Sequence, residues 1–234
     1  MSKSRKLDCL NDLKLRILTL DLGPGSDLDE VTLADHYGIS RTPLREIVQR
    51  LAGDGYLELA ENRGAKVASM DLNTMRTFFQ TAPLIYANIA RLAAENRQPV
   101  QIEDLKKTQT QFATATKNAN AAQAAMLNHR FHAIIGEMAH NPYLVASLSR
   151  MLVDHTRLSQ TFYRPESDTE QALVKKASDQ HDAMISAIEA REPALAIDLT
   201  LQHWDLSKDR LERFVTPDPL PLDVISLKER RNAV

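Results

Sequence analysis

The sequence contains little cysteine, little glycine and no long apolar run. Cys9 is the only cysteine in 234 residues, so no disulfide can form within the chain, and a reducing compartment is expected. Only 7 glycines are present and runs of β-branched residues are few, which argues against a large β-sheet. We find neither an apolar signal-like segment near the start nor an apolar stretch long enough to cross a bilayer. We therefore expect a cytoplasmic protein without a membrane partner.

Neither basic nor acidic side chains are in clear excess. The 29 basic and 31 acidic side chains give a net charge of −2, so the overall charge does not indicate a nucleic-acid partner. Hydrophobic residues make up 43% of the chain and charged residues 26%, as in folded globular proteins, which excludes general disorder. Because helix-favouring residues fill long stretches, the composition predicts a mainly α-helical chain of one large or two smaller domains.

Three short helices and a hairpin are predicted in the first 69 residues. Apolar residues recur at helical spacing over 7–20, 30–37 and 43–51, and glycine-containing turns separate these segments. Two strand patterns at 56–59 and 65–67 flank a turn at 62–64. Three helices followed by a hairpin are typical of a winged helix-turn-helix, so residues 1–69 are predicted to form one.

The rest of the chain shows helical patterns only. Six helices are predicted, at 71–95, 101–118, 120–139, 142–163, 168–191 and 193–214. Amphipathic helices with short connections pack as a bundle, so residues 70–214 are predicted to be a second, all-α domain. Residues 215–234 contain several prolines and no lasting apolar period, and we expect a flexible tail there.

The third helical segment has the features of a DNA-reading helix. Its apolar face leaves arginines outward, and Arg41 and Arg45 are one turn apart at the N-terminal end, the part that enters the major groove. Neighbouring hydroxyls and first-turn N–H groups can bind phosphate, and a hairpin tip can reach the backbone or the minor groove. An arbitrary basic helix is more often merely solvated. The candidate DNA-contacting residues are Ser40, Arg41, Thr42, Arg45, Arg50, Arg63 and Gly64.

Residues 22–67 resemble a known DNA-binding domain. The segment LGPGSDLDEVTLADHYGISRTPLREIVQRLAGDGYLELAENRGAKV is similar, without a gap, to the winged-helix domain of GntR transcription regulators, whose pattern includes LGVSRTPVREAL and RG..V. The resemblance implies that the arginines listed above, with Thr42 and Gly64, contact operator DNA. It also places Tyr56 where the pattern has an apolar residue, so we expect Tyr56 in the domain core.

Three of the seven histidines lie on apolar helix faces. His132 follows Asn128 by one helical turn, so both side chains project from the same side of a helix. His181 and His203 are aligned with apolar residues of two other predicted helices. Three imidazoles and an amide oxygen that converge inside a bundle can bind a divalent metal, although each such histidine alone is more often a core or surface residue.

The segments around these histidines resemble a known effector domain. LNHRFHAIIGEMAHNPYL at 127–144 and SDQHDAMISAIEAREPALAIDLTLQH at 178–203 are similar to the FCD domain, the C-terminal effector domain of the FadR subfamily of GntR regulators. The resemblance implies a metal held by His132, His181 and His203, with Asn128 where the family pattern has aspartate. Six bundle helices instead of seven place the chain nearer the VanR-like branch.

The chain departs from that pattern at two places. Asn128 supplies a neutral oxygen, which disfavours hard cations, while three imidazoles still suit zinc or nickel. Ala82 and Tyr86 stand where family members carry an arginine and a glutamate, which weakens the expectation of a carboxylate effector. Arg157 in the fourth bundle helix can still anchor a carboxylate, or can be a solvated or interface residue. The candidate effector-binding residues are therefore Tyr86 and Arg157.

The remaining histidines and the one tryptophan carry no such signal. Trp204 is expected to pack in the core, although its place beside His203 would also allow it to line the cavity. The other histidines are expected at the surface, namely His36, His129, His140 and His155.

Together these features predict a ligand-responsive transcription regulator and not an enzyme. A homodimer is expected, because two DNA-binding heads read operator half-sites about 34 Å apart. A metal or small-molecule effector in the bundle would act by binding one arrangement of the heads better than the other. One alternative is a metal-dependent hydrolase with an appended DNA-binding domain, for which no general base is recognisable. Another is a DNA-binding scaffold with an empty bundle.

Overall fold

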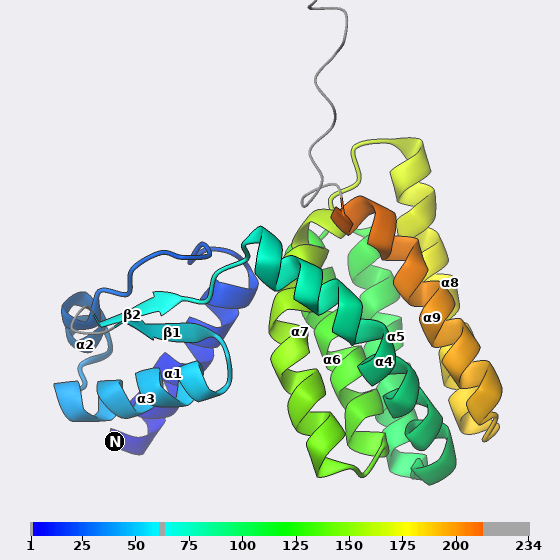
Figure 1. The fold of residues 1–234 in the computed structure, drawn as a ribbon, viewed down its shortest axis with the longest axis horizontal. Helices are drawn as coiled ribbons and strands as arrows, with labels where there is room; N and C mark the ends of the chain where they lie inside the picture. The colour runs from blue at the N-terminus through cyan, green and yellow to red at the C-terminus, as the bar shows by residue number, and fades with distance from the viewer. Residues whose placement is uncertain (1, 61–63, 213–234) are drawn as a thin grey trace, which may run out of the picture.

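The computed structural model describes residues 2–60 and 64–212, which form two helical modules joined by a short linker (Figure 1). The first module contains α1 (Ser2–Leu18), α2 (Glu30–Tyr37), α3 (Arg41–Gly53) and the antiparallel strands β1 (Leu57–Ala60) and β2 (Gly64–Val67). The second contains α4 (Leu72–Asn96), α5 (Pro99–Lys117), α6 (Ala121–Met138), α7 (Pro142–Phe162), α8 (Asp168–Glu189) and α9 (Pro193–Glu212). The predicted class, a winged helix-turn-helix followed by a helical bundle, is confirmed.

Local sequence sets the turn that separates α2 from α3. The carboxylate of Asp29 accepts hydrogen bonds from the backbone N–H groups of Val31 and Thr32, which begins α2. Gly38 ends it in the left-handed conformation, with φ of 57°. The next helix, α3, buries the predicted apolar stripe of Leu44, Ile47, Val48 and Leu51. Tyr56 is also buried, as expected, in the core that α1, α3 and the hairpin share.

Prolines begin three of the bundle helices. Pro99, Pro142 and Pro193 each occupy the first position of a helix, where the missing N–H would have no partner within the helix. α4 packs against α9, α5 against α6 and α8, and α6 against α7. The main apolar core runs between these helices and includes Phe131 and Trp204. The expectation that Trp204 packs in the core is therefore met.

The middle of α7 lies between the two modules. All residues from 152 to 160 are buried, so this stretch has no solvent-facing side. Val153 belongs to the apolar core of the first module, and Gln160 donates a hydrogen bond to the backbone oxygen of Leu18 in α1 at 3.0 Å. The N-terminal module therefore packs directly on a helix of the bundle.

Helix boundaries in the bundle agree with the predicted ones within two residues at each end. α1 begins at Ser2, five residues earlier than predicted, because polar residues at its start carry no apolar period. The predicted division at residue 69 falls in the linker between β2 and α4. Arg63 and the predicted tail at 215–234 lie outside the described residues. Among the helices that the structure describes, none combines the length and apolar character needed to cross a membrane.

Candidate metal centre and nucleic-acid interface

The N-terminal end of α3 presents polar side chains to solvent. Arg41, Arg45 and Arg50 are exposed, as are Ser40 and Thr42. Ser40 precedes the helix but its hydroxyl makes no capping hydrogen bond, so the group stays available to an outside acceptor or donor. None of these side chains packs in the core. All of them are therefore available to contact the DNA backbone or the bases.

A hollow separates α3 from the hairpin. It measures about 470 Å³ and is lined by Glu30, Arg45, Val48, Gln49, Leu59 and Gly64. Gly64 has φ of 79°, a backbone conformation that glycine adopts without strain, at the point where the hairpin returns as β2. Arg45 and Gly64 therefore face the same hollow, while the predicted contribution of Arg63 lies outside the described residues.

Three predicted histidines meet inside the bundle. His132 from α6, His181 from α8 and His203 from α9 each offer a ring nitrogen, and these atoms all lie within 4.8 Å of one another. His132 and His181 are 3% and 0% exposed, so neither ring is in contact with bulk water. The three histidines therefore lie together inside the bundle, as their positions on apolar helix faces predict.

The donor atoms at this cluster have no partners. Asn128 Oδ1, His132 Nε2 and His181 Nε2 are buried without a hydrogen bond. Buried polar atoms in folded proteins are almost always paired, so these three atoms, two on cluster histidines and one a helical turn before His132, need an explanation. A bound cation gives one, because each of these atoms is a metal ligand. The residues present therefore fit a divalent metal.

Two glutamine side chains orient the rings. The amide nitrogen of Gln109 donates to the backbone oxygen of Ser178 at 2.9 Å, which directs the amide oxygen of Gln109 to His181 Nδ1 at 3.0 Å. Because an amide oxygen only accepts, Nδ1 carries the hydrogen and the lone pair lies on Nε2. Gln180 Oε1 lies 3.1 Å from His203 Nδ1 and acts in the same way.

Burial keeps the imidazoles neutral. Loss of water lowers the pKa of His132 and of His181 well below the usual value near 6.5, and the neighbouring histidines lower it further. Burial also lowers the pKa of His203 to about 4. A metal ligand must be deprotonated, so at neutral pH these rings are ready to bind without first losing a proton.

The cluster contains no carboxylate. Among the described residues, the only group of histidine, cysteine and acidic side chains close enough to hold a metal consists of the three histidines. The remaining donor is the amide oxygen of Asn128, and the two residues that orient the rings are also neutral amides. No donor here would offset the charge of a divalent ion. Such a site favours zinc or nickel, which imidazole binds well, over hard cations such as magnesium, which prefer carboxylates.

Tyr86 borders the histidine cluster. Its ring lies 5.3 Å from that of His132, measured between centroids, and 5.9 Å from that of Trp204. Its hydroxyl is hydrogen-bonded to His155 Nδ1 at 2.6 Å. Tyr86 therefore lies beside the histidine cluster, and its role in effector binding stays a prediction.

The expectation that His155 and His129 are surface residues is wrong. His155 is 6% exposed, and burial lowers its pKa to about 3. His129 is half-buried, lies 2.7 Å from Thr156 Oγ1 and has its pKa lowered to about 4, again mainly by burial. Both histidines are covered because α7 is enclosed on all sides. His36 and His140 are exposed, as expected.

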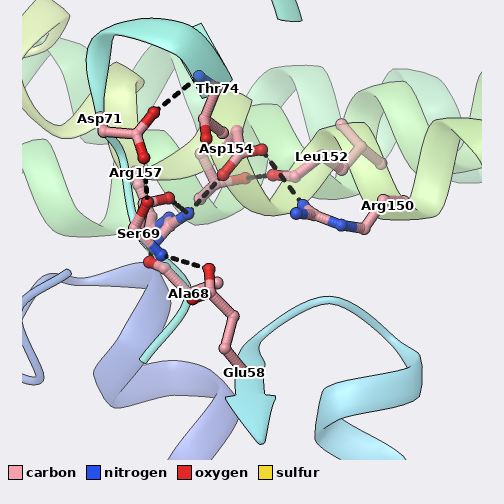
Figure 2. Close-up of polar contacts among 10 residues, drawn as sticks. Glu58, Ala68, Ser69, Asp71, Thr74, Arg150, Leu152, Asp154 and Arg157 are labelled. Carbon is pink, nitrogen blue, oxygen red and sulfur yellow. Dashed lines mark hydrogen bonds and ion pairs between the residues drawn. The ribbon is translucent and has the colours of Figure 1, made fainter. Parts of the chain in front are cut away.

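Arg157 lies elsewhere. Its guanidinium donates to the backbone oxygen of Ala68 at 2.6 Å and forms a buried ion pair with Asp154 (Figure 2). The sequence left two roles open for Arg157, either to anchor a carboxylate or to be a solvated or interface side chain. These contacts are those of an interface side chain. The two candidate effector residues, Tyr86 and Arg157, thus belong to different parts of the molecule.

Sequence reasoning missed Gln109. The residue lies on the buried stripe of α5, between Leu105 and Phe112, at helical spacing. A glutamine on such a stripe needs a polar partner inside the protein, and this signal was available from the sequence. Gln180, which directly precedes His181, carried no comparable pattern.

Two family models match the chain. The model described as "FCD domain" matches residues 79–206, and the one described as "Bacterial regulatory proteins, gntR family" matches residues 9–67. Between them they cover both modules and the candidate sites on each.

Curated relatives and solved structures agree with these matches. The HTH-type transcriptional regulator YdhC of Bacillus subtilis is 21% identical over 88% of this chain and 90% of its own length. The gluconate operon transcriptional repressor of the same organism is 24% identical over 86% and 82%. The structure of E. coli McbR/YncC superposes with a TM-score of 0.76 at 20% identity, covering 90% of this chain and 98% of that one. At this identity the superposition supports the fold alone.

The buried histidines predict an acid-sensitive fold. In the unfolded chain these rings protonate near pH 6.5, whereas in the folded, metal-free protein the pKa values of His203 and His129 are about 4. Between these values the unfolded state binds more protons, so the free energy of unfolding should fall as pH drops from 6.5 toward 5. Urea denaturation of EDTA-treated protein at pH 7.0, 6.0 and 5.0 measures this.

The exposed His140 supplies the control. A His140→Gln variant should show the same pH dependence as the wild-type protein, because this ring is in contact with water in both states. A free energy of unfolding that stays constant from pH 7 to pH 5 would contradict the predicted protonation of the buried set.

Proposed function

The chain belongs to the GntR family of transcription regulators with an FCD domain, and from this we propose that it is a ligand-responsive homodimer that binds operator DNA. In this proposal α3 and the hairpin contact the DNA, and the histidine cluster of the bundle holds a zinc or nickel ion. A small-molecule effector binds beside that ion. The observation that carries the proposal is the group of three unpaired donor atoms within the FCD region.

DNA contact is proposed for the exposed residues at the start of α3. Arg41 and Arg45 are adjacent on one helical face and project away from the core. A guanidinium is suited to the O6 and N7 atoms of guanine, and to phosphate. Ser40 and Thr42 lie beside the first N–H groups of the helix, where a phosphate oxygen can accept hydrogen bonds. Arg50 and Gly64 extend the proposed surface along α3 and the start of β2, and Arg63 is included from the sequence alone.

We expect the Arg45→Ala variant to lose roughly 1–3 kcal/mol of specific binding free energy if Arg45 reads a base. The measurement is fluorescence anisotropy with a duplex obtained by in vitro selection on the wild-type protein. Arg91→Ala is the matched control, because Arg91 is a half-exposed arginine of α4 that is paired with Glu95. Operator binding that is unchanged in a folded Arg41→Ala/Arg45→Ala variant would reject this role.

A homodimer is proposed because one winged helix reads only one half-site. Large apolar side chains remain exposed on α4 and α9, two helices that pack against each other, and among them are Leu84 at 66% and Leu195 at 43%. Exposed apolar surface of this kind is often covered by a second copy. Light scattering on the full chain at micromolar concentration should give twice the monomer mass of 26.3 kDa. A mass equal to that of the monomer would refute the dimer.

The proposed metal ligands are Asn128, His132, His181 and His203. When bound, the ion would supply a fixed positive charge and open coordination positions inside the bundle. The protein residues hold it, and Gln109 and Gln180 keep the ring lone pairs directed inward. Since every donor is neutral, an anionic effector group such as a carboxylate would compensate the charge of the ion. Tyr86, beside His132, is positioned to contact the same effector.

The metal-dependent hydrolase is the weaker reading. Water activation at such a site usually needs a carboxylate or a second base near the metal. Within the described residues, the cluster has only histidines and an amide around it. The regulators among the similar proteins point the same way, and we retain binding without turnover as the proposal.

Replacing Asn128 with aspartate should strengthen metal retention, because the added negative charge offsets part of the charge of the ion. His181→Ala/His203→Ala should lose the metal, and its thermal stability should stop responding to added zinc. Elemental analysis of protein purified without a nickel column, after dialysis against zinc, nickel or manganese at pH 7, gives the stoichiometry. His140→Ala is the control for loss of a histidine outside the cluster. Failure of the wild-type protein to bind any of the three ions stoichiometrically would remove the metal from the proposal.

A further inference from the structure

The linker between the two modules is held by a buried arginine. Arg157 lies in α7 and is 1% exposed. Its guanidinium donates to Ala68 O at 2.6 Å and reaches Ser69 O at 3.5 Å (Figure 2). These carbonyls belong to the segment that leads from β2 into α4. One side chain of the bundle thus binds the backbone that positions the DNA-binding module.

Asp154 completes this contact. Its carboxylate pairs with Arg157 on one side and with Arg150 at 3.1 Å on the other, so it fixes both guanidinium groups (Figure 2). The side chain of Arg150 passes close over Gly55, in the turn before β1, so a Cβ there would displace it. Arg157 therefore contacts the linker and Arg150 the N-terminal module, and Asp154 pairs with both.

The linker makes further contacts of its own. The Ser69 N–H donates to Glu58 of β1 at 2.9 Å, and the Ser69 hydroxyl donates to Asp71 at 3.0 Å. Asp71 in turn accepts from the Thr74 N–H and begins α4. A change in the position of residues 68 and 69 would thus reach both the hairpin and the start of α4.

This junction is also where polar atoms remain unsatisfied. Apart from the three donor atoms at the histidine cluster, the buried side-chain atoms without a partner in the described chain are Arg157 Nε and Gln160 Oε1. Gln160 is the residue that donates to Leu18 in the N-terminal module. Buried atoms without hydrogen bonds disfavour the state that buries them, and they would be hydrated if the modules separated. Separation of the modules would let water reach these two atoms.

The same stretch of α7 also borders the cluster of His132, His181 and His203. His155 is hydrogen-bonded to Tyr86 beside His132, and it lies between Asp154 and Arg157 in the sequence. Thr156 contacts His129 of α6. Since a packed helix moves as a rigid element, a shift of α7 caused at His155 would displace the arginine that binds the linker.

We propose that Arg157 is the positioning residue of the DNA-binding module, and that its hold on residues 68 and 69 changes when a metal ion binds the histidine cluster. The second part rests on the function proposed above, whereas the first part stands on the junction alone. Arg157 touches neither DNA nor metal in this scheme. It acts by fixing the direction in which the linker leaves the bundle.

The experiment is hydrogen exchange of the full chain, followed by mass spectrometry of a peptide that spans residues 66–75, with and without one equivalent of zinc. Asp154→Asn/Arg157→Met removes both charges of the buried pair together, so no lone carboxylate is left inside the protein. Arg157→Lys keeps a positive charge that can still donate to Ala68 O. Arg130→Met is the matched control, because Arg130 is an exposed arginine that pairs with Glu137 within α6.

In wild-type protein and in Arg130→Met, the linker peptide should exchange slowly, and zinc should alter its rate. In the double variant it should exchange at least tenfold faster, with the same rate whether zinc is present or not, while zinc stoichiometry is unchanged. Arg157→Lys should recover part of the protection. Recovery by lysine separates a positioning role from simple loss of packing, because lysine restores the contact with the carbonyl but fills the site less well.

If the linker peptide of the double variant exchanged at the same rate as that of the wild-type protein, the positioning role of Arg157 would be overturned. An equal zinc effect in the wild-type protein and the double variant would overturn transmission through Arg157. If elemental analysis finds no zinc in the wild-type protein, the metal proposal fails by that result. The zinc-free comparison of the two proteins then still decides whether Arg157 holds the linker.

Discussion

A helix that is enclosed on all sides must find partners within the protein for every polar side chain that it carries. The middle of α7 is such a helix, since residues 152–160 are all buried, and many of them are polar. His155 is hydrogen-bonded to Tyr86 beside the histidine cluster. Arg157 and Gln160 donate instead to the linker and to α1. The position of the N-terminal module on the bundle follows from this requirement more than from apolar contact, because Val153 is the only residue of α7 in the core of that module.

The histidine cluster is subject to a second constraint, because no carboxylate belongs to it among the described residues. Five histidines with lowered pKa values share one region of the bundle, and burial is the first cause for each of them. Neutral amides, and no carboxylates, accept from the Nδ1 atoms of His181 and His203. A carboxylate there would stabilise a protonated ring, and the added proton would occupy the Nε2 lone pair. Neutral partners therefore keep these lone pairs available.

The sequence predicts the elements better than it predicts what joins them. Proline and asparagine mark the helix ends by local chemistry, and His132, His181 and His203 were found because each interrupts an apolar stripe. The burial of His155 and Arg157 could not be found in this way, because a stretch that is buried on every side has no period to detect. Arg157 contacts Ala68, 89 residues earlier in the chain, and His155 contacts Tyr86 of another bundle helix, 69 residues earlier. Such contacts depend on tertiary packing and leave no local pattern.

Gln109 carries a consequence for how such a cavity can change over time. Its amide differs from a carboxylate in one group, and the codons of glutamine and glutamate differ by one base, as do those of asparagine and aspartate. At Gln109, Gln180 and Asn128, single base changes would exchange a neutral oxygen for an anionic one without altering the size of the side chain. At Gln109 and Gln180 an anionic oxygen would stabilise a protonated ring, so the cluster would take up protons more readily, whereas at Asn128 it would add negative charge beside His132. The charge of the cluster thus depends on single atoms of three side chains, while the helices around it stay the same.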